Sequence, residues 1–332
     1  MGSTPMQRSA GLSLSFAALL IAATPIGTPV LADDYPQRAV TMVVPLPPGG
    51  ATDLFARLLA QELREKLHQP FVIENRPGAG TTVAAAAVAK SAPDGYTLFL
   101  APMSTLAVNA ALYKALPYDP VKDFAPIALV GQSEFVLIAN PSLGAKTFPE
   151  LIALIQGRPG QLNYASAGPG TPHHIFMELL QRTAGLRMQH VPFRGGVHAV
   201  TAVVAGEIPL MIADVASALA MIRDGKVNTF AVPSPGRVTA LPDVPTFAES
   251  GLPGFAATSW YSIVARTGTP RSTIDKLNAV LTGYVARPDV QDKLAAIGIR
   301  PLTSTPEELE KFIAAEIRKW AQVVKDAGIS PE

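Results

Sequence analysis

The sequence lacks cysteine altogether in its 332 residues. This absence excludes disulfide bonds, thiolate metal ligands, a cysteine nucleophile and a lipid anchor attached to a cysteine. An excess of one charge is also missing, since 27 Lys and Arg residues stand against 26 Asp and Glu residues. A chain with this balance presents no basic face for nucleic acid and no strong field for a membrane surface, so we expect neither partner.

Long apolar runs are missing as well, except near the N-terminus. Residues 10–23 form an apolar run behind a polar start that carries Arg8, and small residues follow up to Ala32. The run is shorter than the roughly 20 residues that span a bilayer, and the pattern is typical of a secretory signal peptide. A buried N-terminal helix is the alternative. We expect residues 1–32 to be a signal peptide cleaved after Ala32, and the rest of the chain to be a soluble periplasmic protein.

Short apolar runs alternate with segments of helical periodicity beyond residue 38. Such alternation indicates an α/β fold with parallel sheets and helices on their faces. Thr147-Phe148-Pro149-Glu150 is a capping box, which predicts the start of a further helix. We expect strands at residues 39–44, 71–74, 97–101, 162–165, 188–192, 208–212 and 227–232, and helices at residues 52–67, 81–90, 171–183, 198–205, 272–285 and 305–327.

Two extended segments, residues 134–140 and 259–265, separate these blocks, and each is followed by a break. The layout predicts two lobes joined by two crossing segments, each lobe being a mainly parallel sheet flanked by helices. We assign residues 33–133 and 259–332 to lobe 1, and residues 134–258 to lobe 2.

Closure of the two lobes on a ligand is expected to bend the chain near Asn140 and Ser259. Trp260 lies beside the second crossing segment and should sense this motion. Trp320 lies in the last predicted helix, and we expect it to be remote from the ligand.

Two glycine-rich loops connect a strand to a helix, one in each predicted lobe. Glycine lets the backbone approach a ligand closely, and the free N–H groups at the start of the following helix attract an anion. Each loop alone is compatible with an ordinary turn, but a facing pair predicts a site for a carboxylate held by backbone N–H and hydroxyl groups. The residues concerned are Pro48, Gly49 and Gly50 in the first loop, and Ser166, Gly168, Gly170 and Thr171 in the second.

Three charged residues follow strands or loops of this kind, and each has two interpretations. Asp53 satisfies the helix end or orients the first loop, or it contacts an amine on a ligand. Arg194 meets a ligand carboxylate or makes a surface ion pair. Asp214 lines the cleft or caps the helix that follows it.

The spacing of the histidines does not indicate a metal site. His173 and His174 are adjacent and therefore point about 100° apart on a helix, and the pair His174 and Glu178 lacks a third ligand. His190 lies in a predicted strand, where a hydrogen-bonded core histidine is the more frequent role. Nucleophile-elbow, dinucleotide and phosphate-loop signatures are absent. We therefore expect no metal, no cofactor and no enzymatic activity.

Several segments of the sequence together resemble one protein family. The chain resembles the Bug-type receptors, the TctC-like solute-binding proteins of tripartite tricarboxylate transport systems, over essentially its whole length after residue 32. It departs from the family pattern at His68, where glycine is usual, and in having two histidines after the second loop. The matching segments include PLPPGGATDLFARLLAQEL, VIENRPGAGTTVAA, LYKALPYDPVKDFAPIALV, LNYASAGPGTPHH, HVPFRGG and LPDVPTFAESGLPGF.

The resemblance implies a two-lobed type II periplasmic-binding-protein fold that binds a small organic carboxylate in the cleft. It also implies that the second loop holds one ligand carboxylate, that water connects the ligand to Pro48 and Gly49, and that Ser104 and His173 lie nearby. We expect a monomer that delivers its ligand to a tripartite tricarboxylate transporter complex. Two alternatives stay open: an exported enzyme with His173 or His190 as base, and a ligand sensor for a membrane signalling partner.

Overall fold

Two β-sheets organise the chain in the computed structural model, which describes residues 1–3 and 35–326. The predicted signal peptide and its cleavage site after Ala32 lie outside the described residues. The first sheet has the strand order β11-β4-β10-β3-β1-β2, and the second has the order β7-β6-β8-β5-β9. The strands are β1 Val40–Val44, β2 Phe71–Asn75, β3 Thr97–Pro102, β4 Phe124–Ser133, β5 Phe135–Ala139, β6 Asn163–Ser166, β7 Gln189–Pro192, β8 Leu210–Asp214, β9 Asn228–Thr229, β10 Ser259–Arg266 and β11 Ile299–Pro301.

Both sheets are mixed, within the expected α/β fold class. In the first sheet β1 runs parallel to β2 and β3, whereas β10 runs antiparallel to β3 and β4. In the second sheet β6 runs parallel to β7 and β8, whereas β5 runs antiparallel to β8 and β9. The prediction of mainly parallel sheets holds for strands followed by a crossover helix. It is wrong for β4, β5 and β10, because these strands lie where the chain leaves or re-enters a sheet and no crossover helix sets their direction.

The helices begin directly after most of the parallel strands, as the sequence pattern predicted. The capping box is confirmed, since Thr147 Oγ1 accepts the Glu150 N–H (3.4 Å) and the Glu150 carboxylate accepts the Thr147 N–H (3.4 Å). His68, which replaces the family's usual glycine, adopts a left-handed φ of 54° at the end of α1. The helices are α1 Ala51–Leu67, α2 Thr82–Ala89, α3 Asn109–Leu112, α4 Phe148–Gln156, α5 Pro172–Ala184, α6 Gly196–Ala205, α7 Val215–Arg223, α8 Arg271–Val285, α9 Pro288–Ala296 and α10 Pro306–Asp326.

The chain passes from the first sheet to the second at Glu134, between β4 and β5. Asn140 follows β5 at its end away from Glu134, and the expected bend at Asn140 stays a prediction. Residues 259–265 belong to β10, which lies between β3 and β4 in the first sheet. The predicted crossing segments are therefore mostly sheet strands, and the actual passage near Glu134 is short.

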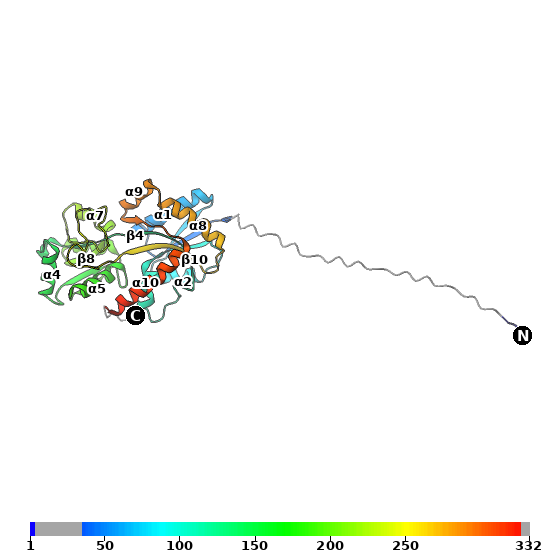
Figure 1. The fold of residues 1–332 in the computed structure, drawn as a ribbon, viewed down its shortest axis with the longest axis horizontal. Coiled ribbons are helices and arrows are strands. Elements are labelled where there is room, and N and C mark those ends of the chain that lie inside the picture. The colour runs from blue at the N-terminus through cyan, green and yellow to red at the C-terminus, as the bar shows by residue number, and fades with distance from the viewer. Residues whose placement is uncertain (4–34, 327–332) are drawn as a thin grey trace. The chain divides into compact units, whose positions relative to one another are not determined.

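Alternate residues of the inner strands face opposite sides of their sheet, as the two-residue period of a strand requires. In β1, Met42 belongs to the apolar cluster under α1 and α8, whereas Val43 belongs to the cluster on the opposite face, under α2 and α10. Figure 1 shows these two pairs of helices on either side of β4 and β10. The cluster that contains Val43 also includes Leu137 of β5 and Phe176 of α5. One apolar core therefore continues from the first sheet into the second.

Candidate functional site

The first glycine loop ends at the N-terminus of α1, and its tip faces open space. Pro48, Gly49 and Gly50 are exposed, and a Cβ built on either glycine would meet no atom within 4 Å. Gly49 has a φ of 87°, in the left-handed region that favours glycine. The first helical hydrogen bond runs from Leu54 N–H to Gly50 O (3.0 Å). The N–H groups before Leu54 therefore have no acceptor inside the helix and lie beside the open tip, where they can bind an anion.

Asp53 holds the first loop in place. Its Oδ2 atom accepts the Gly49 N–H (3.0 Å) and Arg57 Nε (2.9 Å), and its Oδ1 atom accepts Asn75 Nδ2 (3.0 Å). Burial alone raises the pKa of this carboxyl, but the hydrogen bonds from Arg57, Gly49 and Asn75 outweigh it and leave the pKa below its ordinary value. Asn75 also donates to the Leu46 carbonyl (3.0 Å). These bonds match the interpretation of Asp53 as the residue that orients the loop.

The second glycine loop is held by hydrogen bonds within itself. The Ser166 side chain is buried, and its Oγ accepts the Gly168 N–H (3.0 Å) and shares a hydrogen bond with His190 Nε2 (2.5 Å). The Gly170 N–H donates to His174 Nδ1 (3.1 Å), and the Thr171 hydroxyl donates to the Gly168 carbonyl (2.6 Å). The two glycine N–H groups that were predicted to hold a carboxylate are thus engaged, because Ser166 and His174 supply acceptors. Thr171 N–H makes only a long bond to Gly168 O (3.4 Å).

The stacked rings of Tyr164, His190 and His174 lie next to the second loop. His174 stacks on His190 with ring centroids 4.0 Å apart, and Tyr164 stacks on His190 at 5.1 Å. Burial and the neighbouring His190 lower the pKa of His174 to about 4, and burial also lowers the pKa of His190. The His174 ring is therefore neutral near pH 7, which leaves Nδ1 free to accept the Gly170 N–H.

His173 points away from this stack and pairs with Asp214. Its Nε2 atom lies 3.1 Å from Asp214 Oδ2, and the Asp214 Oδ1 atom accepts the Ser217 N–H (2.9 Å) at the start of α7. The capping interpretation of Asp214 is confirmed. Burial raises the pKa of Asp214, but the interactions with His173 and Ser217 outweigh it, so the pKa lies below its ordinary value. A Cβ on Gly196 would come within 2.6 Å of Asp214 Oδ2, so the start of α6 approaches this pair closely.

Tyr261 of β10 binds the first turn of α1, just after the first loop. Its hydroxyl shares a hydrogen bond with Thr52 Oγ1 (2.9 Å) and accepts one from Ser133 Oγ (2.9 Å). Burial raises the pKa of Tyr261, these hydrogen bonds lower it in part, and the negative charge of Asp214 adds to the rise. The Asp214 carboxylate is therefore within electrostatic range of the Tyr261 hydroxyl. Thr52, two residues after the first loop, thus bonds Tyr261, and His173, two residues after the second, bonds Asp214.

Two predicted residues take no part in these hydrogen bonds. Ser104 is buried in the π-helical turn Ser104–Val108, where its carbonyl accepts the Asn109 N–H. Arg194 is exposed. Neither side chain has a hydrogen bond or ion pair recorded within residues 35–326.

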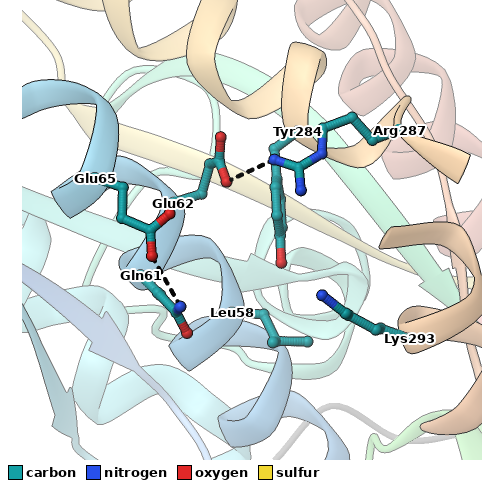
Figure 2. A pocket seen from close by; sticks show the side chains of 7 residues that line it. All are labelled: Leu58, Gln61, Glu62, Glu65, Tyr284, Arg287 and Lys293. Atoms are coloured by element: carbon teal, nitrogen blue, oxygen red, sulfur yellow. Dashed lines mark hydrogen bonds and ion pairs between the residues drawn. The ribbon is translucent and has the colours of Figure 1, made fainter. Parts of the chain in front are cut away.

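A small cavity of about 130 Å³ lies elsewhere, between α1, α8 and α9. Figure 2 shows that Glu62 points toward Arg287, with which it forms an ion pair of 3.1 Å. None of the predicted ligand residues lines this cavity. Its lining residues are Leu58, Gln61, Glu62, Glu65, Tyr284, Arg287 and Lys293.

The described part of the chain contains no group of three or more His, Cys, Asp or Glu residues that could hold a metal ion. None of its helices is both long enough and apolar enough to cross a membrane.

The sequence of this chain matches a known protein family. Residues 55–329 match the model of the tripartite tricarboxylate transporter family receptor, TctC. The chain belongs to this receptor family. It is 39% identical to the protein BugT of Bordetella pertussis over 316 residues, which cover 95% of this chain and 97% of BugT. The TctC family consists of periplasmic binding proteins and not of enzymes, so the expectation of a non-enzymatic protein is confirmed.

Two solved structures share the fold of this chain. Rpa4515 of R. palustris, solved with adipate, has a TM-score of 0.85 and 33% identity over 90% of this chain and 100% of its own. MatC of Rhodopseudomonas palustris, solved with bound malate, has a TM-score of 0.79 and 36% identity over 87% of this chain and 100% of its own. The two-sheet α/β fold of this receptor is thus the periplasmic-binding-protein fold.

Sequence reasoning missed several residues that build the candidate site in this TctC receptor. Tyr261 was assigned only to a crossing segment, although its hydroxyl binds both Thr52 and Ser133. The roles of His174 and His190 as supports of the second loop also went unrecognised. The period-two alternation of β10 and β7 could have shown which side chains face the same side, but not which strands lie beside them.

Proposed function

We propose that this protein binds a small organic carboxylate where the two glycine loops meet, and passes it to a tripartite tricarboxylate transporter complex. Membership of the receptor family supports this proposal, as do the relatives solved with adipate and with malate. The observation that carries it is the open tip of the first loop, where the N–H groups before Leu54 have no acceptor inside the helix and Gly49 and Gly50 leave the approach clear.

The carboxylate oxygens are proposed to accept hydrogen bonds from the free N–H groups at the start of α1 and from the Thr171 N–H. Gly49 and Gly50 leave the approach to α1 open. Helix N-termini carry a partial positive charge that favours an anion. Because Gly168 and Gly170 donate within the second loop, we assign them to shaping that loop. Pro48, Ser104, Ser166 and Arg194 complete the proposed surroundings of the ligand.

We further propose that the protein works as a monomer in the periplasm after loss of residues 1–32. Residues 33–133 and 259–332 form one proposed lobe, and residues 134–258 form the other. The strands of each set belong to a single sheet, which supports this division. N-terminal sequencing of the periplasmic protein should begin within a residue or two of Asp33, and recovery of only the intact Met1 form from the cytoplasm would contradict export.

A thermal-melting screen tests the proposed ligand class. Malate, succinate, adipate, citrate and aspartate are added to the purified protein, with glucose and glycerol as neutral controls. A ligand present at one hundred times its Kd stabilises the folded state by about 2.7 kcal/mol, which raises the melting temperature by several degrees. At least one carboxylate should do so, and a screen in which only neutral compounds stabilise the protein would contradict the proposal.

A further inference from the structure

His173 carries an unsatisfied polar atom. Its Nδ1 is the buried side-chain nitrogen for which the described residues provide no hydrogen-bond partner, and the residue is only 8% exposed. Buried polar side-chain atoms in folded proteins almost always have a partner, so an exception calls for an explanation. Such exceptions are explained by strain, by a bound water or ion, or by a functional role of the site.

The orientation of the His173 ring is fixed by its neighbours. Nε2 is held by Asp214 at 3.1 Å, and Asp214 is itself held by the Ser217 N–H. The ring of Phe135 contacts the imidazole edge to face, with centroids 5.3 Å apart and planes at 77°. A ring flip would place Nδ1 on Asp214 only by breaking the Nε2 contact and leaving Nε2 unsatisfied in turn. The Nδ1 atom of His173 is therefore left without a hydrogen-bond partner among the described residues.

His173 lies close to the second loop. His173 is the second residue of α5, immediately after the second loop. Side chains near the start of a helix lean toward its N-terminus, which here is Thr171 and the loop. The first turn of α5 therefore carries a buried imidazole whose Nε2 is bound and whose Nδ1 is not.

We propose that His173 Nδ1 hydrogen-bonds a hydroxyl group of the ligand and so selects hydroxycarboxylates such as malate; this inference rests on the proposed function. A ligand carboxylate can only accept a hydrogen bond, so it pairs with Nδ1 only when the ring is doubly protonated. A ligand ammonium can only donate, so it pairs only with the neutral ring. A hydroxyl both donates and accepts, and it therefore satisfies Nδ1 in either protonation state.

Three four-carbon dicarboxylates that differ at one carbon test this selection: malate carries a hydroxyl, succinate a hydrogen and aspartate an ammonium. Titration calorimetry measures their Kd values with the wild-type protein and with His173→Gln. The glutamine amide can still donate to Asp214 but offers nothing at the Nδ1 position. Wild type should bind malate about 10-fold more tightly than succinate. His173→Gln should bring the two Kd values to within about 2-fold, chiefly by weakening malate.

Controls separate this effect from misfolding. If His173→Gln proves unstable, His173→Phe takes its place. This variant keeps an aromatic ring against Phe135 and should also lose the preference for malate. His68→Asn changes a histidine at the far end of α1, in a left-handed position that asparagine tolerates, and should keep the wild-type preference.

Several outcomes would overturn the inference. They are an unchanged malate preference in His173→Gln, an equal loss of malate and succinate affinity, or a selective loss of aspartate affinity. Binding of another carboxylate by a wild-type protein that ignores malate would also overturn it. If no carboxylate of the wider screen binds the wild-type protein, the proposed function itself fails, and this inference fails with it.

Discussion

The indole of Trp320 in α10 stacks on the ring of Phe176 in α5, with centroids 5.8 Å apart and planes at 23°. Phe176 lies three residues after His173, about one helical turn from the second loop. Trp320 therefore packs against the helix that follows the second loop, although its place near the end of the chain indicated a remote position. Trp260 and Trp320 also share one acceptor, because both indole N–H groups donate to Glu316 Oε2 at 2.8 Å. The last helix, α10, thus makes direct contact with α5, the helix that follows the second loop.

Trp320 should report ligand binding by fluorescence. A ligand that draws the two loops together shifts α5 relative to α10 and alters the environment of the Trp320 indole. We predict that Trp320→Phe abolishes most of the emission change on carboxylate binding, whereas Trp260→Phe retains it, because the Trp320 ring stacks on Phe176 of α5 and the Trp260 ring packs on Phe312 of α10. The reverse pattern, with the signal lost only in Trp260→Phe, would contradict this account of the motion.

Gly170 should be essential for binding because of its surroundings as well as its backbone. Its φ is 70°, and a Cβ at this position would come within 2.7 Å of Leu112 Cδ1 in α3. Gly160 has a similar φ of 75°, but a Cβ there would meet nothing within 4 Å. We predict that Gly170→Val and Gly160→Val each lower the free energy of unfolding by about 1–2 kcal/mol, as measured by urea denaturation.

Only Gly170→Val should also lose ligand-induced thermal stabilisation. Equal stabilisation by the same carboxylate in the two variants would place the ligand away from the second loop.

His174 should support binding through its acceptor atom and not through its ring. His174→Phe keeps a ring to stack on His190 but leaves the Gly170 N–H without an acceptor, and should weaken carboxylate binding about 10-fold. His174→Asn places an amide oxygen near the position of Nδ1 and should stay within about 3-fold of wild type. Calorimetry measures both values. Wild-type affinity in His174→Phe would show that the Gly170 bond does not matter.

Stability should also fall in mild acid because of His174. The unfolded chain binds a proton on this histidine as the pH falls through 6.5, whereas the folded protein resists until about pH 4. The free energy of unfolding therefore decreases between these two values, by at most about 3 kcal/mol from this residue. The decrease measured by urea denaturation should be smaller in His174→Asn than in wild type, and identical pH profiles would contradict the assignment.

Local features of the fold were predictable from the sequence, whereas long-range features were not. The capping box of Thr147, the buried strand β1 and the glycine loops depend on neighbouring residues, and the structure has each of them where the sequence indicates. β4 was missed, because Pro126 interrupts the usual pattern of a strand and β10 supplies its partner from more than a hundred residues away. The short strand β11 and helix α9 were missed as well.

The candidate site likewise has residues that were predictable from the sequence and partners that were not. Loop chemistry pointed to Gly49 and Gly170, and the residue after a strand pointed to Asp214. The partners of these residues depend on strand register, which places His190 beside Tyr164 and brings Tyr261 next to Ser133. No pattern within a single segment reveals such pairs.

The central claim is that one carboxylate contacts both glycine loops, and hydrogen–deuterium exchange of the mature protein tests it most directly. Amide exchange is compared without ligand and with a saturating amount of the carboxylate that gives the largest melting shift. The account predicts slower exchange in two separate segments, residues 45–54 and residues 166–174. Protection confined to one of these segments, or centred on the cavity beside Glu62 and Arg287, would contradict it.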